Sequence, residues 1–115
     1  AERWKIWSAP EHWDAAAVRA RLEREYVRSF DPAAVTRQLA AILASGSRAE
    51  ALPSVTAPTL VIHGLADTLV KPDGGRRTAE LVPGAKRLEI PDMGHELPAA
   101  HWDTVLDAVE AHTGA

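Results

Sequence analysis

The sequence predicts an α/β fold in which a helical first part is followed by two parallel strands and their helices. Three observations lead to this prediction. Apolar residues before residue 47 recur at helical spacing, a short apolar run follows at 59–62, and a helical stretch separates that run from a second predicted strand at 86–90. We therefore divide the chain into a helical segment, residues 1–46, and a strand-helix-strand-helix segment, residues 47–115.

The first part predicts two or three helices with no strand between them. Residues 11–30 carry apolar residues at a spacing close to one helical turn, among many charges; they are Trp13, Ala17, Ala20 (or Val18 and Leu22) and Tyr26. Asp31-Pro32 is typical of an N-cap followed by proline at the first helical position. The helix that follows has an apolar stripe, and it ends at Ser45-Gly46-Ser47; the stripe consists of Val35, Leu39, Ile42 and Leu43.

The second part predicts a strand, a helix, a strand and a final helix. The run 59–62 is too short for a helix, and its continuous apolarity favours a strand covered on both faces, as in parallel sheets. Asp73-Gly74-Gly75 precedes a helical stretch at 76–82, and residues 86–90 form the second strand. The last helix, 101–112, carries an apolar face made of Trp102, Val105, Leu106 and Val109.

Two parallel strands alone make a poor sheet. Both edges stay unpaired and much of each face stays uncovered, whereas an independent sheet generally needs three or more strands. We therefore expect one end of a larger α/β sheet, incomplete without an N-terminal half. The alternative is a compact helical domain that bears a small sheet.

Composition restricts the partners and the location of the protein. The formal net charge of -3 is unlike the basic excess of a nucleic-acid binder, and no apolar run approaches the roughly 20 residues of a membrane helix. The chain has no cysteine, which is typical of a reducing compartment and excludes thiolate metal sites. We expect a cytoplasmic protein with a small-molecule substrate, no cofactor, no metal, no nucleic acid and no membrane.

An acid and a histidine follow the two predicted strands. Asp67 comes after the first strand and His95 after the second. In open α/β sheets ligands bind beyond the carboxyl ends of the strands, so these two side chains are expected to meet there. A carboxylate in contact with an imidazole fixes its tautomer and stabilises its protonated form. Each residue also has a simpler interpretation, since Asp67 could form a turn and His95 could be an exposed loop residue.

Two segments of the sequence resemble a known family. The segments PTLVIHGLADTLVKP and IPDMGHELP are similar to the C-terminal part of the α/β-hydrolase fold, in which an HG-x-x-D segment supplies the catalytic acid and a GH segment the catalytic histidine. The resemblance covers residues 30–112 best, and it is strongest to small-molecule methylesterases and lactone hydrolases. It implies that Asp67 and His95 are the catalytic acid and base, and that residues 1–46 are the end of a cap or lid.

The chain departs from this family in one respect. The family's nucleophile lies in a G-x-S-x-G turn that precedes the acid and the histidine, and none of the serines here has those flanking residues. The resemblance therefore implies a serine hydrolase that cleaves small esters or lactones through an acyl-enzyme, to which this chain supplies the acid and histidine. The nucleophile must come from a missing N-terminal half or a companion chain, and the 115 residues alone are expected to be inactive.

Two alternatives remain open. Haloalkane dehalogenases and epoxide hydrolases share the fold but carry an aspartate nucleophile, and cofactor-free haloperoxidases share the serine triad. The residue at the nucleophile turn would separate them. A different class of function is a non-catalytic binding protein, or a subunit that completes a sheet with another chain.

Several further residues have a functional and a structural interpretation. Leu69, Met93 and Leu97 flank the acid and the histidine, and they could line an acyl pocket or only fill space. His95-Glu96 with His101 does not match the zinc motif H-E-x-x-H, because the second histidine comes too late and Pro98 interrupts the helix. The tryptophans Trp4, Trp7 and Trp13 could wall a lid or pack a cap. His63 is interpreted as structural, and His12 and His112 are assigned no role.

Overall fold

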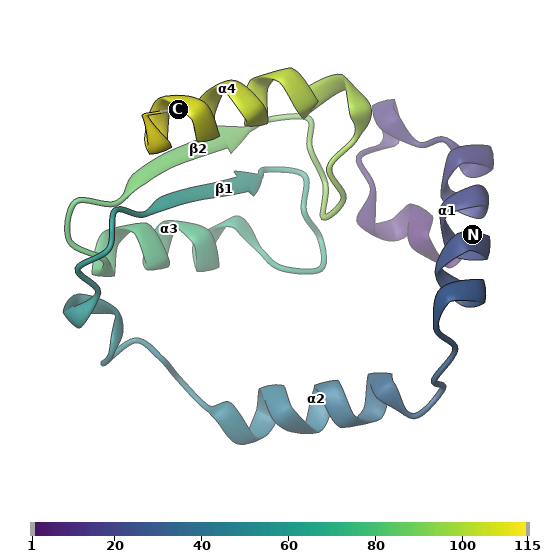
Figure 1. Ribbon diagram of the computed structural model, residues 1–115, viewed down its shortest axis with the longest axis horizontal. Coiled ribbons are helices and arrows are strands. Elements are labelled where there is room, and N and C mark those ends of the chain that lie inside the picture. Colours follow the sequence, from purple (N-terminus) through teal and green to yellow (C-terminus); the bar gives the residue numbers. More distant parts are fainter. Residues whose placement is uncertain (1, 115) are drawn as a thin grey trace.

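The computed structural model describes residues 2–114 and has the predicted α/β architecture. Two α-helices, α1 and α2, precede the strand β1, and the order then continues with α3, β2 and α4 (Figure 1). Short 3-10 helices, among them Glu2–Trp7, Pro10–His12 and Ala99–His101, connect these elements. No helix within residues 2–114 is long and apolar enough to cross a membrane.

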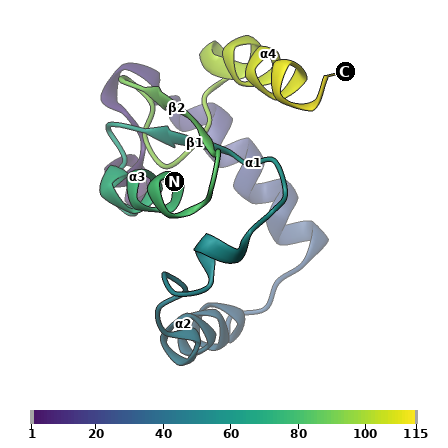
Figure 2. The same ribbon diagram turned by 90° about the vertical axis from the view of Figure 1, so that its left-hand side faces the viewer.

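The centre of the structure is a β1–α3–β2 crossover. Strand β1, Leu60–Gly64, pairs in parallel with β2, Lys86–Ile90, and the register aligns Leu60 with Lys86 and Gly64 with Ile90. Both predicted strands are confirmed. Helix α3 lies along one face of this pair and α4 along the other (Figures 1 and 2). The carboxyl ends of both strands therefore meet at one edge, where the loops that follow them lie close together.

Helix α3, Pro72–Leu81, begins four residues earlier than the predicted position 76. Pro72 takes the first helical position, where its missing N–H costs nothing and its fixed φ suits a helix. Gly74 and Gly75 were expected to precede the helix, and they lie inside it instead. The reason is tertiary packing, because a Cβ on Gly75 would lie 2.6 Å from His63 Nδ1.

Helix α1 spans Ala15–Arg28, so the predicted start at residue 11 is wrong. Asp14 caps the helix by accepting hydrogen bonds from the N–H groups of Ala16 at 2.9 Å and Ala17 at 3.0 Å. Residues 10–12 form a separate 3-10 turn before it. Val18 is the buried residue of α1, whereas Tyr26 of the expected apolar face is exposed.

Helix α2, Ala34–Ser45, lies apart from the sheet in both views (Figures 1 and 2). Asp31 accepts a hydrogen bond from Ala33 N–H at 3.0 Å, so it supports the turn that leads into the helix and is not itself the N-cap residue. Gly46 ends the helix at φ 60°, as expected for a glycine stop. The predicted stripe of Val35, Leu39, Ile42 and Leu43 is present, but all four side chains are exposed.

Helix α4, Trp102–Thr113, follows the 3-10 turn Ala99–His101 and starts one residue after the predicted position. Its predicted apolar face is only partly covered. Val105 is half-buried, whereas Trp102 and Leu106 are exposed by 56% and 57%. As with α2, apolar residues at regular spacing face solvent.

The described part of the chain buries little apolar surface for its size. The accessible area is 8434 Å², against about 6,100 Å² for a folded monomer of 12.4 kDa. The radius of gyration is 16.2 Å, where a compact domain of this length has about 13 Å. The buried hydrophobic residues are few and come from different elements; they are Ala9, Val18, Val82, Ile90 and Met93.

Candidate active site

Asp67 lies in the tight turn that follows β1. Its carboxylate is held by the turn itself, because Oδ1 accepts hydrogen bonds from the N–H groups of Leu69 at 2.8 Å and Val70 at 2.9 Å. The side chain is 6% exposed. Local backbone donors therefore fix one oxygen of a buried carboxylate and leave the other oxygen available.

His95 lies in the loop that follows β2, and two glycines bring this loop to Asp67. A Cβ on Gly64, the last residue of β1, would lie 2.1 Å from the Met93 carbonyl oxygen, so only glycine allows this approach. Ala66 N–H donates to the same carbonyl at 3.0 Å. On the other side, a Cβ on Gly94 would lie 2.5 Å from the Trp7 carbonyl oxygen, to which His95 N–H donates at 2.7 Å.

The two predicted residues are in direct contact. His95 Nδ1 lies 2.9 Å from Asp67 Oδ2. An ionised carboxylate only accepts, so Nδ1 carries the proton and, in the neutral imidazole, Nε2 carries the lone pair. Within residues 2–114 the side-chain hydrogen bonding of His95 is confined to Nδ1, and the ring is 39% exposed. His95 Nε2 is therefore free to take a proton.

Asp67 is ionised at neutral pH. Burial acts to raise its pKa, but hydrogen bonds from Val70 N–H, His95 and Leu69 N–H outweigh burial and hold the pKa below its ordinary value. The buried acid thus stays charged, which is the state that orients and stabilises an imidazolium.

His63 has a structural position, as the sequence indicated. Its Nε2 donates to the Val70 carbonyl at 2.8 Å and lies 3.7 Å from Asp67 Oδ2. The close approach of Gly75 holds the ring from the other side. His63 therefore braces the turn that presents Asp67, and its imidazole is committed to a backbone oxygen.

The three predicted pocket residues differ in burial. Met93 is buried, whereas Leu69 and Leu97 are 47% and 45% exposed. A pocket of about 400 Å³ opens beside this region, between α1 and the segment 94–100, and it is lined in part by Ser8, Arg21 and Glu96. Its lining includes none of Leu69, Met93 and Leu97, and their role at an acyl pocket stays a prediction.

No sequence pattern predicted the polar contacts of Glu96, the residue next to His95, which we call the Glu96 anchor. Glu96 accepts a hydrogen bond from Ser8 Oγ at 2.8 Å and forms an ion pair with Arg21 of α1. The Arg21 guanidinium also lies 5.2 Å from the centroid of the Trp4 ring, and Trp4 packs edge-on against Trp7 at 5.1 Å. Glu96 thus ties the loop that carries His95 to the helical first part of the chain.

His12, which was assigned no role from the sequence, has a side-chain partner in the structure. His12 Nε2 lies 2.7 Å from Asp92 Oδ2, and His101 lies on the other side of the same carboxylate. No local pattern announced this contact, because 80 residues separate the two partners.

Comparison with known proteins shows which proteins the whole chain resembles. The chain is 32% identical over 117 residues to rhodomycin D methylesterase DnrP of Streptomyces peucetius, a match that covers 99% of this chain and 39% of that protein. Its homologues are methylesterases of the α/β-hydrolase family. The resemblance stated from the sequence is thereby confirmed. No protein-family model matches the chain.

Two further relatives match shorter stretches of the chain at higher identity. Rhodomycin D methylesterase DauP of Streptomyces sp. (strain C5) is 39% identical over 69 residues, covering 60% of this chain and 23% of that protein. A pimeloyl-[acyl-carrier protein] methyl ester esterase of Stenotrophomonas maltophilia (strain K279a) is 38% identical over 65 residues, covering 56% and 25%. The chain thus spans between about a quarter and two-fifths of the length of these relatives.

Proposed function

We propose that this chain supplies the acid and the histidine of a serine esterase that cleaves small carboxylic esters, methyl esters foremost, or lactones. The observation that carries the proposal is the 2.9 Å contact between His95 Nδ1 and the buried Asp67 carboxylate, with His95 Nε2 free. The names of the relatives support ester cleavage over the dehalogenase, epoxide-hydrolase and haloperoxidase alternatives.

The roles of the two residues follow from their geometry. His95 Nε2 takes the proton of a serine hydroxyl as the serine oxygen bonds to the ester carbonyl carbon, and it then gives that proton to the departing alkoxide. Water repeats the sequence on the acyl-enzyme and releases the carboxylic acid. Asp67 does not take up the proton; it holds the Nδ1–H tautomer and stabilises the imidazolium.

The nucleophile and the oxyanion donors belong, in this proposal, to residues outside this chain. None of the serines within it has the nucleophile-turn sequence, and the sheet edges at β1 and β2 are unpaired within residues 2–114. Both features support a larger sheet that continues beyond this chain and carries the serine. In the same proposal residues 1–46 are the end of a cap, residues 47–115 belong to the hydrolase core, and the protein is cytoplasmic.

Kinetics on the full-length protein test the proposal. His95→Ala and Asp67→Asn are compared with wild type on short methyl esters and lactones, and His112→Ala serves as a control histidine on the far part of α4. We expect Asp67→Asn to lower kcat by about 10⁴-fold, because the wrong imidazole tautomer then faces the nucleophile. His95→Ala should lose at least as much, and His112→Ala should match wild type.

Fluorophosphonate labelling separates the remaining outcomes. Labelling of one serine in wild type, with much slower labelling in His95→Ala, supports the serine mechanism. Ester cleavage without any labelled serine would point to an aspartate nucleophile. Full esterase activity in His95→Ala would remove the proposed function.

A further inference from the structure

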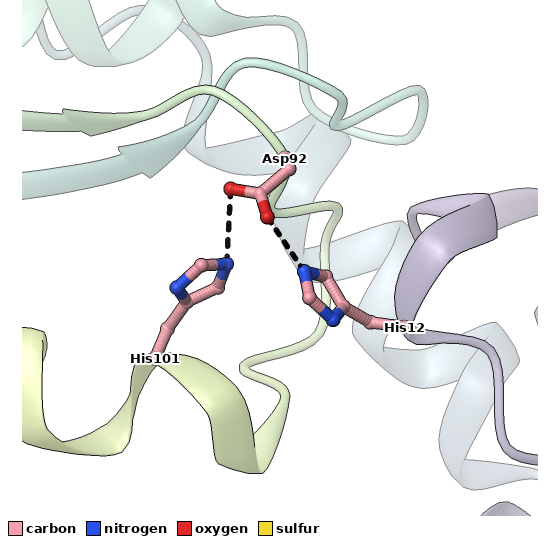
Figure 3. Close-up of side chains that lie close together, drawn as sticks. All are labelled: His12, Asp92 and His101. Atoms are coloured by element: carbon pink, nitrogen blue, oxygen red, sulfur yellow. Dashed lines mark hydrogen bonds and ion pairs between the residues drawn. The ribbon is translucent and has the colours of Figure 1, made fainter.

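Three side chains from distant parts of the chain converge on one point that the proposed ester chemistry does not use. Asp92 lies between His12 and His101, with Oδ2 2.7 Å from His12 Nε2 and Oδ1 3.1 Å from His101 Nε2 (Figure 3). One ligand atom from each residue lies within 4.8 Å of the other two. The cluster joins the 3-10 turn Pro10–His12, the loop after β2 and the turn Ala99–His101.

Hydrogen bonding satisfies only part of this cluster. His12 Nε2 donates to Asp92 Oδ2. His101 Nε2 is also close to the carboxylate, but it is buried and its direction does not fit a hydrogen bond to any group within the described residues. The 3.1 Å distance is a close approach without an aligned N–H···O contact. An imidazole nitrogen is thus buried at the carboxylate without the bond that normally compensates for its desolvation.

We propose that His12, Asp92 and His101 bind a divalent transition-metal ion, with Zn²⁺ as the expected occupant. Two imidazole nitrogens and one carboxylate oxygen match the three-ligand sets that Zn²⁺ accepts, and a deprotonated imidazole nitrogen offers the ion its lone pair along the direction that its N–H would take. Mg²⁺ and Ca²⁺ prefer oxygen ligands throughout, so the two histidines disfavour them.

The distances indicate what metal binding must change. Ligand atoms around a tetrahedral Zn²⁺ with bonds of about 2.0–2.1 Å lie about 3.3 Å apart, so the 2.7 Å contact between His12 and Asp92 has to open by a few tenths of an ångström. The ion then replaces the proton shared by these two groups. The Asp92 side chain is 46% exposed, which provides an entry path and room for water in the fourth position.

The ion would hold in place the loop that carries His95. Asp92 precedes His95 by three residues, and His101 follows it by six. A metal held by both, and by His12 of the N-terminal segment, fixes the two ends of this loop to each other. This inference does not depend on the proposed esterase activity, because it concerns residues that touch neither Asp67 nor the free nitrogen of His95.

Zinc titration of the metal-stripped full-length protein tests the site. Calorimetry gives the stoichiometry and affinity, and the visible spectrum with Co²⁺ in place of zinc reports nitrogen and oxygen ligation. We expect one saturable ion per chain in wild type. His12→Gln, His101→Gln and Asp92→Asn should each weaken zinc binding by at least about tenfold, the loss typical even of outer-shell changes.

Two control variants make the result specific. His112→Gln removes a histidine elsewhere on α4, and His95→Gln removes the histidine that contacts Asp67; both should bind zinc as wild type does. The melting temperature of each variant is measured with and without zinc, so that a loss of stability unrelated to zinc is recognised. If His12→Gln does not fold, His101→Gln carries the test. No saturable zinc binding in wild type, or binding abolished by His95→Gln but not by the cluster variants, would overturn the proposal.

Discussion

At the scale of single residues, the Asp67 carboxylate uses its two oxygens for two separate purposes. Oδ1 is bound by the backbone of its own turn, and Oδ2 is bound by His95. The first set of contacts fixes the position of the carboxylate before any partner arrives. The histidine therefore meets an acid whose geometry is already set, which is the preorganisation that acid–base catalysis needs.

This arrangement predicts a pH dependence of stability. The pKa of Asp67 is lowered in the folded state, so its ionised form stabilises the fold fully above the unfolded pKa of about 3.9 and loses that contribution as pH falls through the folded pKa. We expect the difference in unfolding free energy between wild type and Asp67→Asn to be largest near neutral pH and to shrink below about pH 4. Urea denaturation of both proteins at several pH values measures it. A difference that does not change with pH would contradict this assignment.

At the scale of elements, two adjacent glycines in α3 have opposite surroundings. A Cβ on Gly74 would meet only Val70 at 4.0 Å, whereas a Cβ on Gly75 would meet His63 Nδ1 at 2.6 Å. The same chemical change at neighbouring positions of one helix therefore separates helix propensity from tertiary packing. The two sites act as matched controls for each other.

We expect Gly74→Ala to stabilise the full-length protein by about 0.5–1 kcal/mol, because alanine is the better helix former. Gly75→Ala should destabilise it by about 1–3 kcal/mol, since the His63 ring must move and its bond to the Val70 carbonyl is strained. Thermal and chemical unfolding measure both effects. Stabilisation by Gly75→Ala would show that His63 does not hold α3 to the turn of Asp67.

The elements also show which features the sequence predicts and which it does not. Continuous apolarity predicted the first strand, and the strand-helix-strand-helix order predicted the second. The rule that sites lie at the carboxyl ends of parallel strands then predicted that Asp67 and His95 meet. The start of α3 was missed because Gly74-Gly75 favours a turn locally, whereas contact with His63 places both glycines in a helix. The Glu96 anchor and the His12–Asp92–His101 cluster were missed because their partners are 75 and 80 residues apart, without a local pattern.

At the scale of the whole molecule, the exposed apolar surface is the dominant feature. The accessible area exceeds the value for a compact monomer by about 2,300 Å², and no large side chain within the described residues is completely buried. Helices α2 and α4 both present apolar residues to solvent. Such exposed apolar faces are expected if, as we propose, the sheet continues beyond this chain.

We expect the 115-residue chain, expressed alone, to lack a cooperative unfolding transition and to bind a hydrophobic dye strongly. The reason is that so small a core does not offset the entropy of ordering 115 residues. Full-length protein should unfold cooperatively and bind little dye. Differential scanning calorimetry and dye fluorescence on both proteins measure this contrast. A sharp transition without dye binding in the isolated chain would show that it folds as an independent unit.

The β1–α3–β2 crossover has a consequence for chimeras in which segments are exchanged between related proteins. The acid and the histidine lie on one uninterrupted unit, so insertions or replacements in residues 29–51, between α1 and the 3-10 turn that precedes β1, should leave the distance between them unchanged. The upstream positions that must be kept are the backbone of residues 7–9 facing Gly94 and the partners Ser8 and Arg21 of Glu96. Chimeras that combine this crossover with the corresponding first parts of the related methylesterases should therefore retain the acid–histidine pair.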